Sequence, residues 1–196
     1  REIATNELYF TPVKKDGNSL SMRAYTSDDE YLEFYYSLDQ SDYMMDFDVR
    51  SKGLSDVIQS DEKAKINWEL KGYRHAKSIS YENQYTEILY QYEGDNTDYT
   101  GQGDVAEEQD EDVDWVAFKQ HFFSSILLSD EAFDDGKFIS KNLVEDEDVD
   151  TTYTRKFRAE LSFQPDRDGI NRDMNWYYGP TDYKILDDYE RNLDEI

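Results

Sequence analysis

WVAFKQHFFSSILL, residues Trp115–Leu128, is the most apolar segment of this 196-residue chain, and it decides the fold class. An apolar run of this length is compatible with either a buried helix or a buried strand. Its content of Phe and Ile, with Trp at one end, favours a strand. We therefore expect Trp115–Leu128 to lie in the core of a β-structure.

The segments around this stretch alternate between apolar and polar residues with a period of two, as half-buried strands do. The clearest case is Tyr153–Phe163, in which Phe157 and Leu161 lie on an apolar face that only Arg155 interrupts. Because of this charge, we expect that strand to begin near a sheet edge. Further strands are predicted at Tyr31–Leu38, Tyr43–Val49, Ile66–Leu70, Tyr85–Tyr92 and, after the turn signal Asp134-Asp135-Gly136, near Lys137–Leu143.

The end of the chain predicts a helix over residues 181–196. Thr181 follows Pro180 and is a suitable N-cap residue. Apolar residues then recur at spacings of three and four, which is the pattern of one buried helix face. These residues are Tyr183, Leu186, Tyr189, Leu193 and Ile196.

Two acidic segments, Gly101–Asp114 and Glu145–Asp150, are predicted to be mobile, solvated loops. A calcium-binding loop needs a glycine at its sharp turn, and the acidic runs Asp110–Asp114 and Glu145–Asp150 contain none. We therefore predict no metal site in either segment.

Composition excludes several functions. The net charge of −25 excludes a general nucleic-acid binder and argues against electrostatic docking to anionic lipid headgroups. The chain has no cysteine, which rules out a disulfide framework and a cysteine nucleophile. No apolar run approaches the roughly 20 residues that a membrane-spanning helix needs.

Two motifs, in this order, point to a family. Trp115–Phe123 carries the pattern Trp-x-Ala-x-x-Gln-x-Tyr/Phe-Phe, and Tyr178-Gly179-Pro180 stands directly before the predicted helix. Both resemble the extracytoplasmic domain of the YidC family of membrane protein insertases, in its Bacteroidetes-like form. Weaker resemblances to that domain occur at Thr5–Phe10, at Tyr43–Val49 and at Trp68 with Lys71–Lys77.

The resemblance implies a mainly β fold. We expect a twisted antiparallel β-sandwich of the super-sandwich type, similar to sugar-mutarotase domains, with a C-terminal α-helix. We also expect residues 1–196 to form one domain that lacks the family's first strands. It would lie in the periplasm, at the face of the bacterial inner membrane, and attach through membrane spans outside this chain.

The function that the resemblance implies is accessory and non-enzymatic. Such a domain would help the insertion and folding of inner-membrane proteins, without a cofactor. Its partners would be nascent membrane proteins and components of the Sec translocon such as SecD and SecF. The residues that we expect to contact a partner are Tyr177, Tyr178, Pro180 and Tyr183. Those that match family motifs and that we expect to be structural are Trp115, Ala117, Phe118, Gln120, Phe122, Phe123, Gly179 and Leu186.

Other functions remain open from the sequence alone. Exposed aromatic residues could make the chain a secreted carbohydrate-binding module, which would need coplanar rings at its surface. The apolar block around Phe122 could instead receive a client polypeptide, although we expect it to be core. The two histidines, His75 and His121, are predicted to be structural, because a zinc site would need further ligands. A mutarotase-like fold would not by itself imply an activity.

Overall fold

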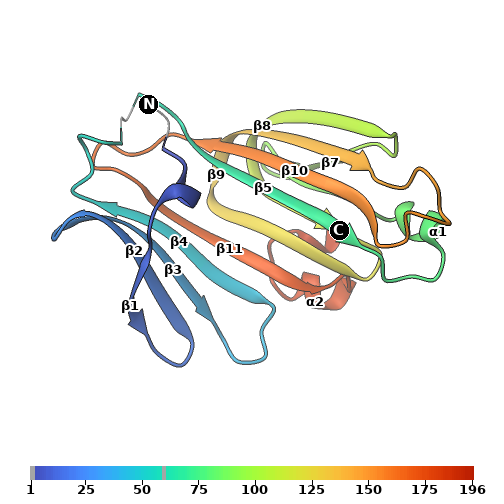
Figure 1. Ribbon diagram of the computed structural model, residues 1–196, viewed down its shortest axis with the longest axis horizontal. Coiled ribbons are helices and arrows are strands. Elements are labelled where there is room, and N and C mark those ends of the chain that lie inside the picture. The colour runs from blue at the N-terminus through green and yellow to red at the C-terminus, as the bar shows by residue number, and fades with distance from the viewer. Residues whose placement is uncertain (1–2, 59–60) are drawn as a thin grey trace. The chain divides into compact units, whose positions relative to one another are not determined.

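The computed structural model describes residues 3–58 and 61–196 and is mainly β (Figure 1). In chain order its elements are η1 Thr5–Glu7, β1 Thr11–Lys15, β2 Ser19–Ser27, β3 Glu30–Leu38, β4 Met44–Lys52, β5 Ala64–Tyr73, α1 Ile79–Asn83, β6 Glu87–Tyr92, β7 Asn96–Tyr99, β8 Val105–Lys119, β9 Phe123–Asn142, β10 Tyr153–Phe163, β11 Asn171–Pro180, α2 Tyr183–Asp187 and η2 Leu193–Glu195. They form two compact units. The first holds residues 3–58, 61–64 and 164–176, and the second holds residues 65–163 and 177–196.

The first unit is a meander of β1, β2, β3 and β4, followed in the strand order by the beginning of β11. Its neighbouring strands are antiparallel, and the register aligns Met22, Phe34 and Val49 across β2, β3 and β4. The Phe34 ring lies 5.8 Å from that of Phe47, which is 6.0 Å from Trp176. The rings of Phe34, Phe47 and Trp176 therefore follow one another on one face of this sheet.

The second unit is built around the long strand β9. Strand β8 pairs with β9 on one side, followed by β6 and β7, while β10 pairs with β9 on the other side and also with β5. The Trp68 ring of β5 stacks on Phe118 of β8 with centroids 3.8 Å apart, and Phe118 lies 5.2 Å from Phe157 of β10. Because β5 and β8 are not neighbours in the strand order, this contact shows that the sheet folds over itself into a sandwich around an aromatic core.

The apolar segment Trp115–Leu128 has β-conformation, as expected, but it is divided between two strands. Trp115–Lys119 ends β8, and Phe123–Leu128 begins β9. A tight turn joins them, closed by the backbone N–H of Gln120, which donates to the carbonyl of Phe123 at 2.9 Å. The predicted strand Tyr153–Phe163 is β10 with the same bounds, and the mainly β, antiparallel fold with a C-terminal helix is confirmed.

Two expectations about strand boundaries are wrong. Residues 105–114, predicted as a loop, form the first part of β8 and pair with β9 from Val105 opposite Lys141 to Val113 opposite Phe133. Backbone pairing with β9 outweighs the poor β-propensity of the acidic residues, and Glu107 also forms a surface ion pair with Lys137 at 2.7 Å. Gly136 is not a turn residue either. It lies inside β9, where a Cβ atom would come within 2.6 Å of the ring of Phe138.

The predicted closing helix is shorter than expected. Helix α2 covers only Tyr183–Asp187, and its N-cap is Asp182 rather than Thr181, because the Asp182 carboxylate accepts the N–H of Lys184 at 3.0 Å. The backbone then turns through positive φ angles of 53° at Glu190 and 54° at Asn192, which end any α-helix. The apolar spacing is still meaningful, since Leu186 and Leu193 are both buried.

Arg155 also differs from expectation. Its strand, β10, lies between β5 and β9, so it does not run along an edge. The side chain is buried, and its guanidinium donates to the hydroxyl of Ser140 at 2.9 Å and to the carbonyl of Gly103 at 2.6 Å. The buried charge on the apolar face is therefore hydrogen-bonded, to a buried hydroxyl and to a carbonyl of the exposed loop before β8.

Candidate functional site

An exposed group of aromatic rings lies in the second unit, where several strand ends meet. We call it the aromatic surface. It draws on the end of β5 and the loop after it, on α1 and the turn after it, on the β8–β9 turn with the start of β9, and on the start of β10. Its members are Tyr73, His75, Tyr81, Tyr85, His121, Phe122, Phe123 and Tyr153.

Ring contacts join these residues into two sets, which come together in the sequence at the neighbouring residues Phe122 and Phe123. His121 contacts the rings of Tyr81, Tyr85 and Phe122, with centroids 5.4, 4.8 and 4.2 Å away. A second chain of contacts runs from Phe123 to His75 at 5.4 Å and on to Tyr73 at 5.5 Å. Both histidines of the sequence are therefore held among aromatic rings.

The aromatic surface is open to solvent. The exposed fractions of its Tyr and Phe side chains run from 40% at Tyr85 to 55% at Tyr73. Phe122 and Phe123, expected to be core residues, are 47% and 48% exposed, so that expectation is wrong. They sit at a turn, where the chain reverses and cannot cover its own side chains. A contiguous exposed aromatic group indicates an interaction site.

Buried polar groups fix the backbone beneath this surface. Gln120 is 9% exposed, and its side-chain amide donates to the carbonyl of Tyr73 at 2.8 Å, which ties the β8–β9 turn to the end of β5. At Gly72 an added Cβ would lie 3.1 Å from that amide, so glycine allows the close approach. The N–H of Thr181 donates to the carbonyl of Phe122 at 2.9 Å and ties the same turn to the segment before α2.

Glu82 anchors the loop that carries His75. It is fully buried, and its carboxylate accepts the backbone N–H of His75 at 2.9 Å and of Ala76 at 2.8 Å. Ser78 caps α1 by accepting the N–H of Tyr81 at 3.2 Å. The loop and the helix therefore have a defined geometry, although the rings that they present are exposed.

We expect Glu82→Ala to lower the free energy of unfolding by about 2 kcal/mol, because it leaves two partly buried backbone donors without their acceptor. Glu82→Gln keeps one acceptor oxygen and should cost about 1 kcal/mol. Urea titration measures both, with Glu108→Ala on the exposed part of β8 as control. Hydrogen exchange at the amides of His75 and Ala76 should accelerate in the alanine variant. Unchanged exchange there would contradict the anchoring role of Glu82.

The aromatic surface is also unusual in charge. The chain carries 46 acidic residues, yet its two longest runs without Asp or Glu are residues 115–129 and 70–81. Both runs contribute to the aromatic surface, and the second also brings Lys71, Arg74 and Lys77. The ammonium of Lys71 lies 5.7 Å from the centroid of the Tyr153 ring. In a chain with a net charge of −25, the two segments that carry most of these rings thus bring basic but no acidic side chains.

The structure divides the family-motif residues into two groups. Buried residues hold the fold: Trp115, Ala117, Phe118, Gln120, Gly179 and Leu186. Phe122 and Phe123 lie on the aromatic surface instead. An apolar sequence block predicts burial but does not show where the hairpin turns, so sequence alone missed this surface. The two acid-free runs were the signal that could have indicated it.

The four residues that were predicted to contact a partner differ in their exposure to solvent. Tyr177 is fully buried, and its hydroxyl donates to the carbonyl of Pro180 at 2.6 Å, so this ring is part of the core. Pro180 is half-buried. Tyr178 and Tyr183 are 51% and 63% exposed. Of the four side chains, those of Tyr178 and Tyr183 are therefore the most accessible to a partner.

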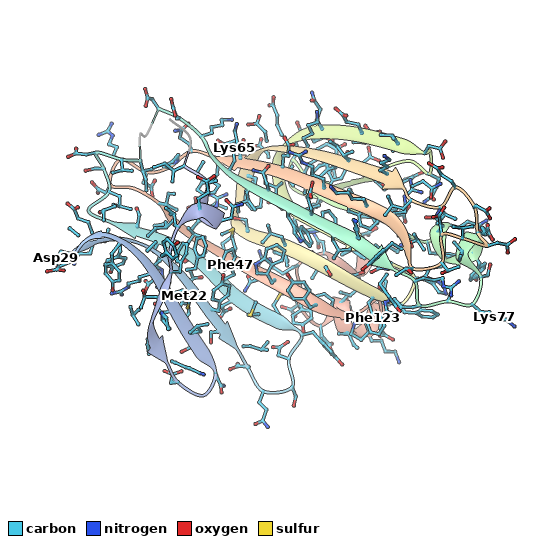
Figure 2. The ribbon with its side chains drawn as sticks, in the orientation of Figure 1. Met22, Asp29, Phe47, Lys65, Lys77 and Phe123 are labelled. Carbon is cyan, nitrogen blue, oxygen red and sulfur yellow. The ribbon has the colours of Figure 1, made fainter. Side chains whose placement is uncertain are left out.

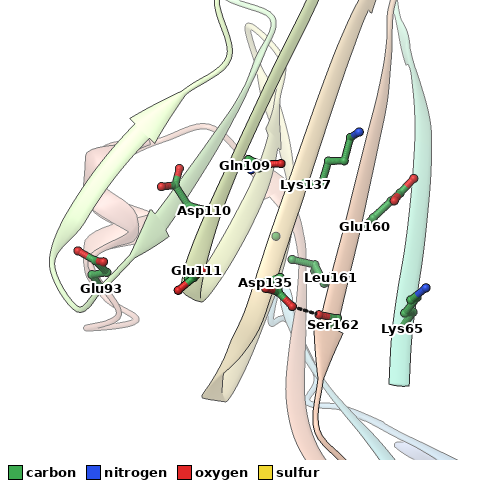
Figure 3. A pocket seen from close by; sticks show the side chains of 11 residues that line it. Lys65, Glu93, Gln109, Asp110, Glu111, Asp135, Lys137, Glu160, Leu161 and Ser162 are labelled. Atoms are coloured by element: carbon green, nitrogen blue, oxygen red, sulfur yellow. Dashed lines mark hydrogen bonds between the residues drawn. The ribbon is translucent and has the colours of Figure 1, made fainter. Parts of the chain in front are cut away.

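A pocket of about 470 Å³ lies elsewhere in the second unit, over β8, β9 and β10 (Figure 3). Two of its charged groups are paired on the same sheet: Glu160 with Arg158 at 2.6 Å, and Lys137 with Glu107 at 2.7 Å. The hydroxyl of Ser162 donates to Asp135 at 2.6 Å, and the Glu107 carboxylate raises the pKa of Lys137. These pairs suit a solvated polar surface.

Within residues 3–58 and 61–196, no three His, Asp or Glu side chains are grouped as metal ligands would be. No helix in those ranges has the length and apolarity to cross a bilayer.

Comparison with known proteins identifies a family. The model of the YidC periplasmic domain matches residues 3–196. The membrane protein insertase YidC of Bacteroides fragilis is 30% identical over 196 residues, and that of Porphyromonas gingivalis is 28% identical. Each alignment covers 98% of this chain but only 31% of the relative, so the chain spans about a third of the length of these proteins.

Among solved structures, a protein of Escherichia coli assigned as an aldose 1-epimerase is similar in outline. It is 10% identical with a TM-score of 0.43, and the match covers 87% of this chain and 68% of the other.

Proposed function

Because the chain belongs to the family of YidC periplasmic domains, we propose that it is the accessory, non-catalytic part of a membrane protein insertase. It would lie at the periplasmic face of the bacterial inner membrane and support the insertion and folding of membrane proteins. The observation that carries this proposal is the family match over residues 3–196, supported by relatives named as insertases.

The contact that we propose with the Sec translocon involves the exposed rings Tyr178 and Tyr183. They flank Pro180 and Thr181 at the junction of β11 and α2. Tyrosine is enriched at protein interfaces because it offers a large apolar ring and a hydroxyl at low entropic cost. The buried hydrogen bond of Tyr177 and the cap at Asp182 hold this junction in place, so that both rings are presented in a fixed geometry.

Photo-crosslinking in the full-length insertase tests this contact. A benzoyl-phenylalanine side chain at Tyr178 or Tyr183 is expected to crosslink to SecD, SecF or another translocon component in intact membranes. The same group at Tyr99, which is 57% exposed on β7, is the matched control. Equal crosslinking at Tyr99 and at the two junction positions would refute the proposed contact surface.

The alternative of a carbohydrate-binding module finds less support. Sugar stacking needs exposed coplanar rings, whereas the ring planes in the contacts of the aromatic surface are 42° to 82° apart. Nearly parallel pairs lie outside the aromatic surface: Trp68 with Phe118 at 17°, where the Phe118 ring is buried, and the half-buried pair of Phe10 with Phe34 at 18°.

A further inference from the structure

We propose that the aromatic surface contacts lipid and rests in the interfacial layer of a zwitterionic phospholipid bilayer. The inference goes beyond the proposed function and takes from it only the premise that the chain works beside a membrane. It concerns residues other than Tyr178 and Tyr183, so the two proposals can fail separately.

The chemistry of the exposed rings fits the boundary between headgroups and acyl chains. Tyrosine is enriched there because its ring enters the apolar region while its hydroxyl remains hydrated. Tyr73, Tyr81, Tyr85 and Tyr153 provide such rings, each 40% to 55% exposed. Phe122 and Phe123 lie next to each other at the β8–β9 turn and offer two apolar rings without a polar group.

The distribution of charge also favours a bilayer as the binding partner of the aromatic surface. A carboxylate is costly to move into a region of low polarity, and most of this chain's surface is rich in carboxylates. The acid-free runs 70–81 and 115–129 supply most of the aromatic surface, so most of its rings have no carboxylate on their own stretch of chain. Lys71 and Lys77 are exposed, and their ammonium groups can donate to lipid phosphates while their aliphatic stems stay along the rings.

Geometry adds a third argument. Lys77 and Phe123 lie on the same side of the second unit as α1 (Figures 1 and 2). The backbone beneath the rings is held by buried Gln120 and Glu82, so the rings need not reorganise on binding. The zwitterionic bilayer is preferred over an anionic one because the net charge of −25 would be repelled by anionic headgroups.

Flotation with vesicles of phosphatidylethanolamine and phosphatidylcholine tests the proposal with the 196-residue chain. We expect the chain to float with the vesicles. The double variant Phe122→Ser/Phe123→Ser should lower the partition coefficient about tenfold, because two half-exposed rings no longer leave water. The matched control is Tyr9→Ser/Tyr99→Ser, which removes rings that are 94% and 57% exposed outside the aromatic surface and should float as the parent does.

The outcomes separate the alternatives. A parent chain that does not float, or a double Phe variant that floats equally well, overturns the proposal. A dimer seen by light scattering that the double Phe variant abolishes, without flotation of the parent, would assign the surface to a second copy and also overturn it. Circular dichroism and thermal melting confirm that each variant is folded. Because the assay contains only lipid and this chain, its result is independent of translocon crosslinking.

Discussion

Phe118→Ala is expected to lower the free energy of unfolding by about 4 kcal/mol, which corresponds to a melting temperature about 10 °C lower. Phe118 is 1% exposed and lies between Trp68, at 3.8 Å, and Phe157, at 5.2 Å. Its removal leaves a cavity between the two layers of the sandwich, and the stiff flanking strands cannot close it fully.

Phe122→Ala is the matched control, because it removes the same ring four residues further along the chain. Its ring is 47% exposed, so we expect a loss of less than about 1 kcal/mol. Thermal unfolding followed by circular dichroism compares the two variants. Equal losses for Phe118→Ala and Phe122→Ala would show that the two positions share one environment, contrary to the structure.

The contrast between these two phenylalanines shows how much of the fold could be predicted from the sequence. Period-two alternation correctly predicted β4, β5 and β10, because every second side chain of a half-buried strand faces the core. Tyr-rich runs that are apolar on both faces correctly predicted β3 and β6. The block around Phe118 was correctly predicted as strand. The position of the turn was not, because an apolar ring has the same pattern at a buried site and at an exposed hairpin tip.

Residues 105–114 show the opposite error. Their acidic composition predicted a loop, yet they form a strand because β9 supplies the backbone partners, and Lys137 also pairs with Glu107 at the surface. Such a partner lies about 30 residues away in sequence, where no local pattern can reveal it. The aromatic surface was missed for the same reason, since its rings come from four separate segments.

Arg155→Ala is expected to cost about 3 kcal/mol, because it removes a large buried side chain and leaves the buried hydroxyl of Ser140 and the carbonyl of Gly103 without their donor. Burial lowers the pKa of the Arg155 guanidinium, while the carboxylates of Asp104 and Glu87 raise it. An arginine remains charged in either case, so the loss should be the same at neutral and at mildly alkaline pH. Urea titration at both pH values measures it.

Arg158→Ala is the control on the same strand, because that side chain is 43% exposed and pairs with Glu160 at the surface. Surface ion pairs contribute little, so this variant should lose less than about 1 kcal/mol. Arg155→Met adds a second comparison, since it keeps most of the stem volume but no donor. If Arg155→Met were as stable as the parent, packing rather than hydrogen bonding would explain the buried arginine. If Arg155→Met lost nearly as much stability as Arg155→Ala, the loss of the two hydrogen bonds to Gly103 and Ser140 would explain most of the destabilisation.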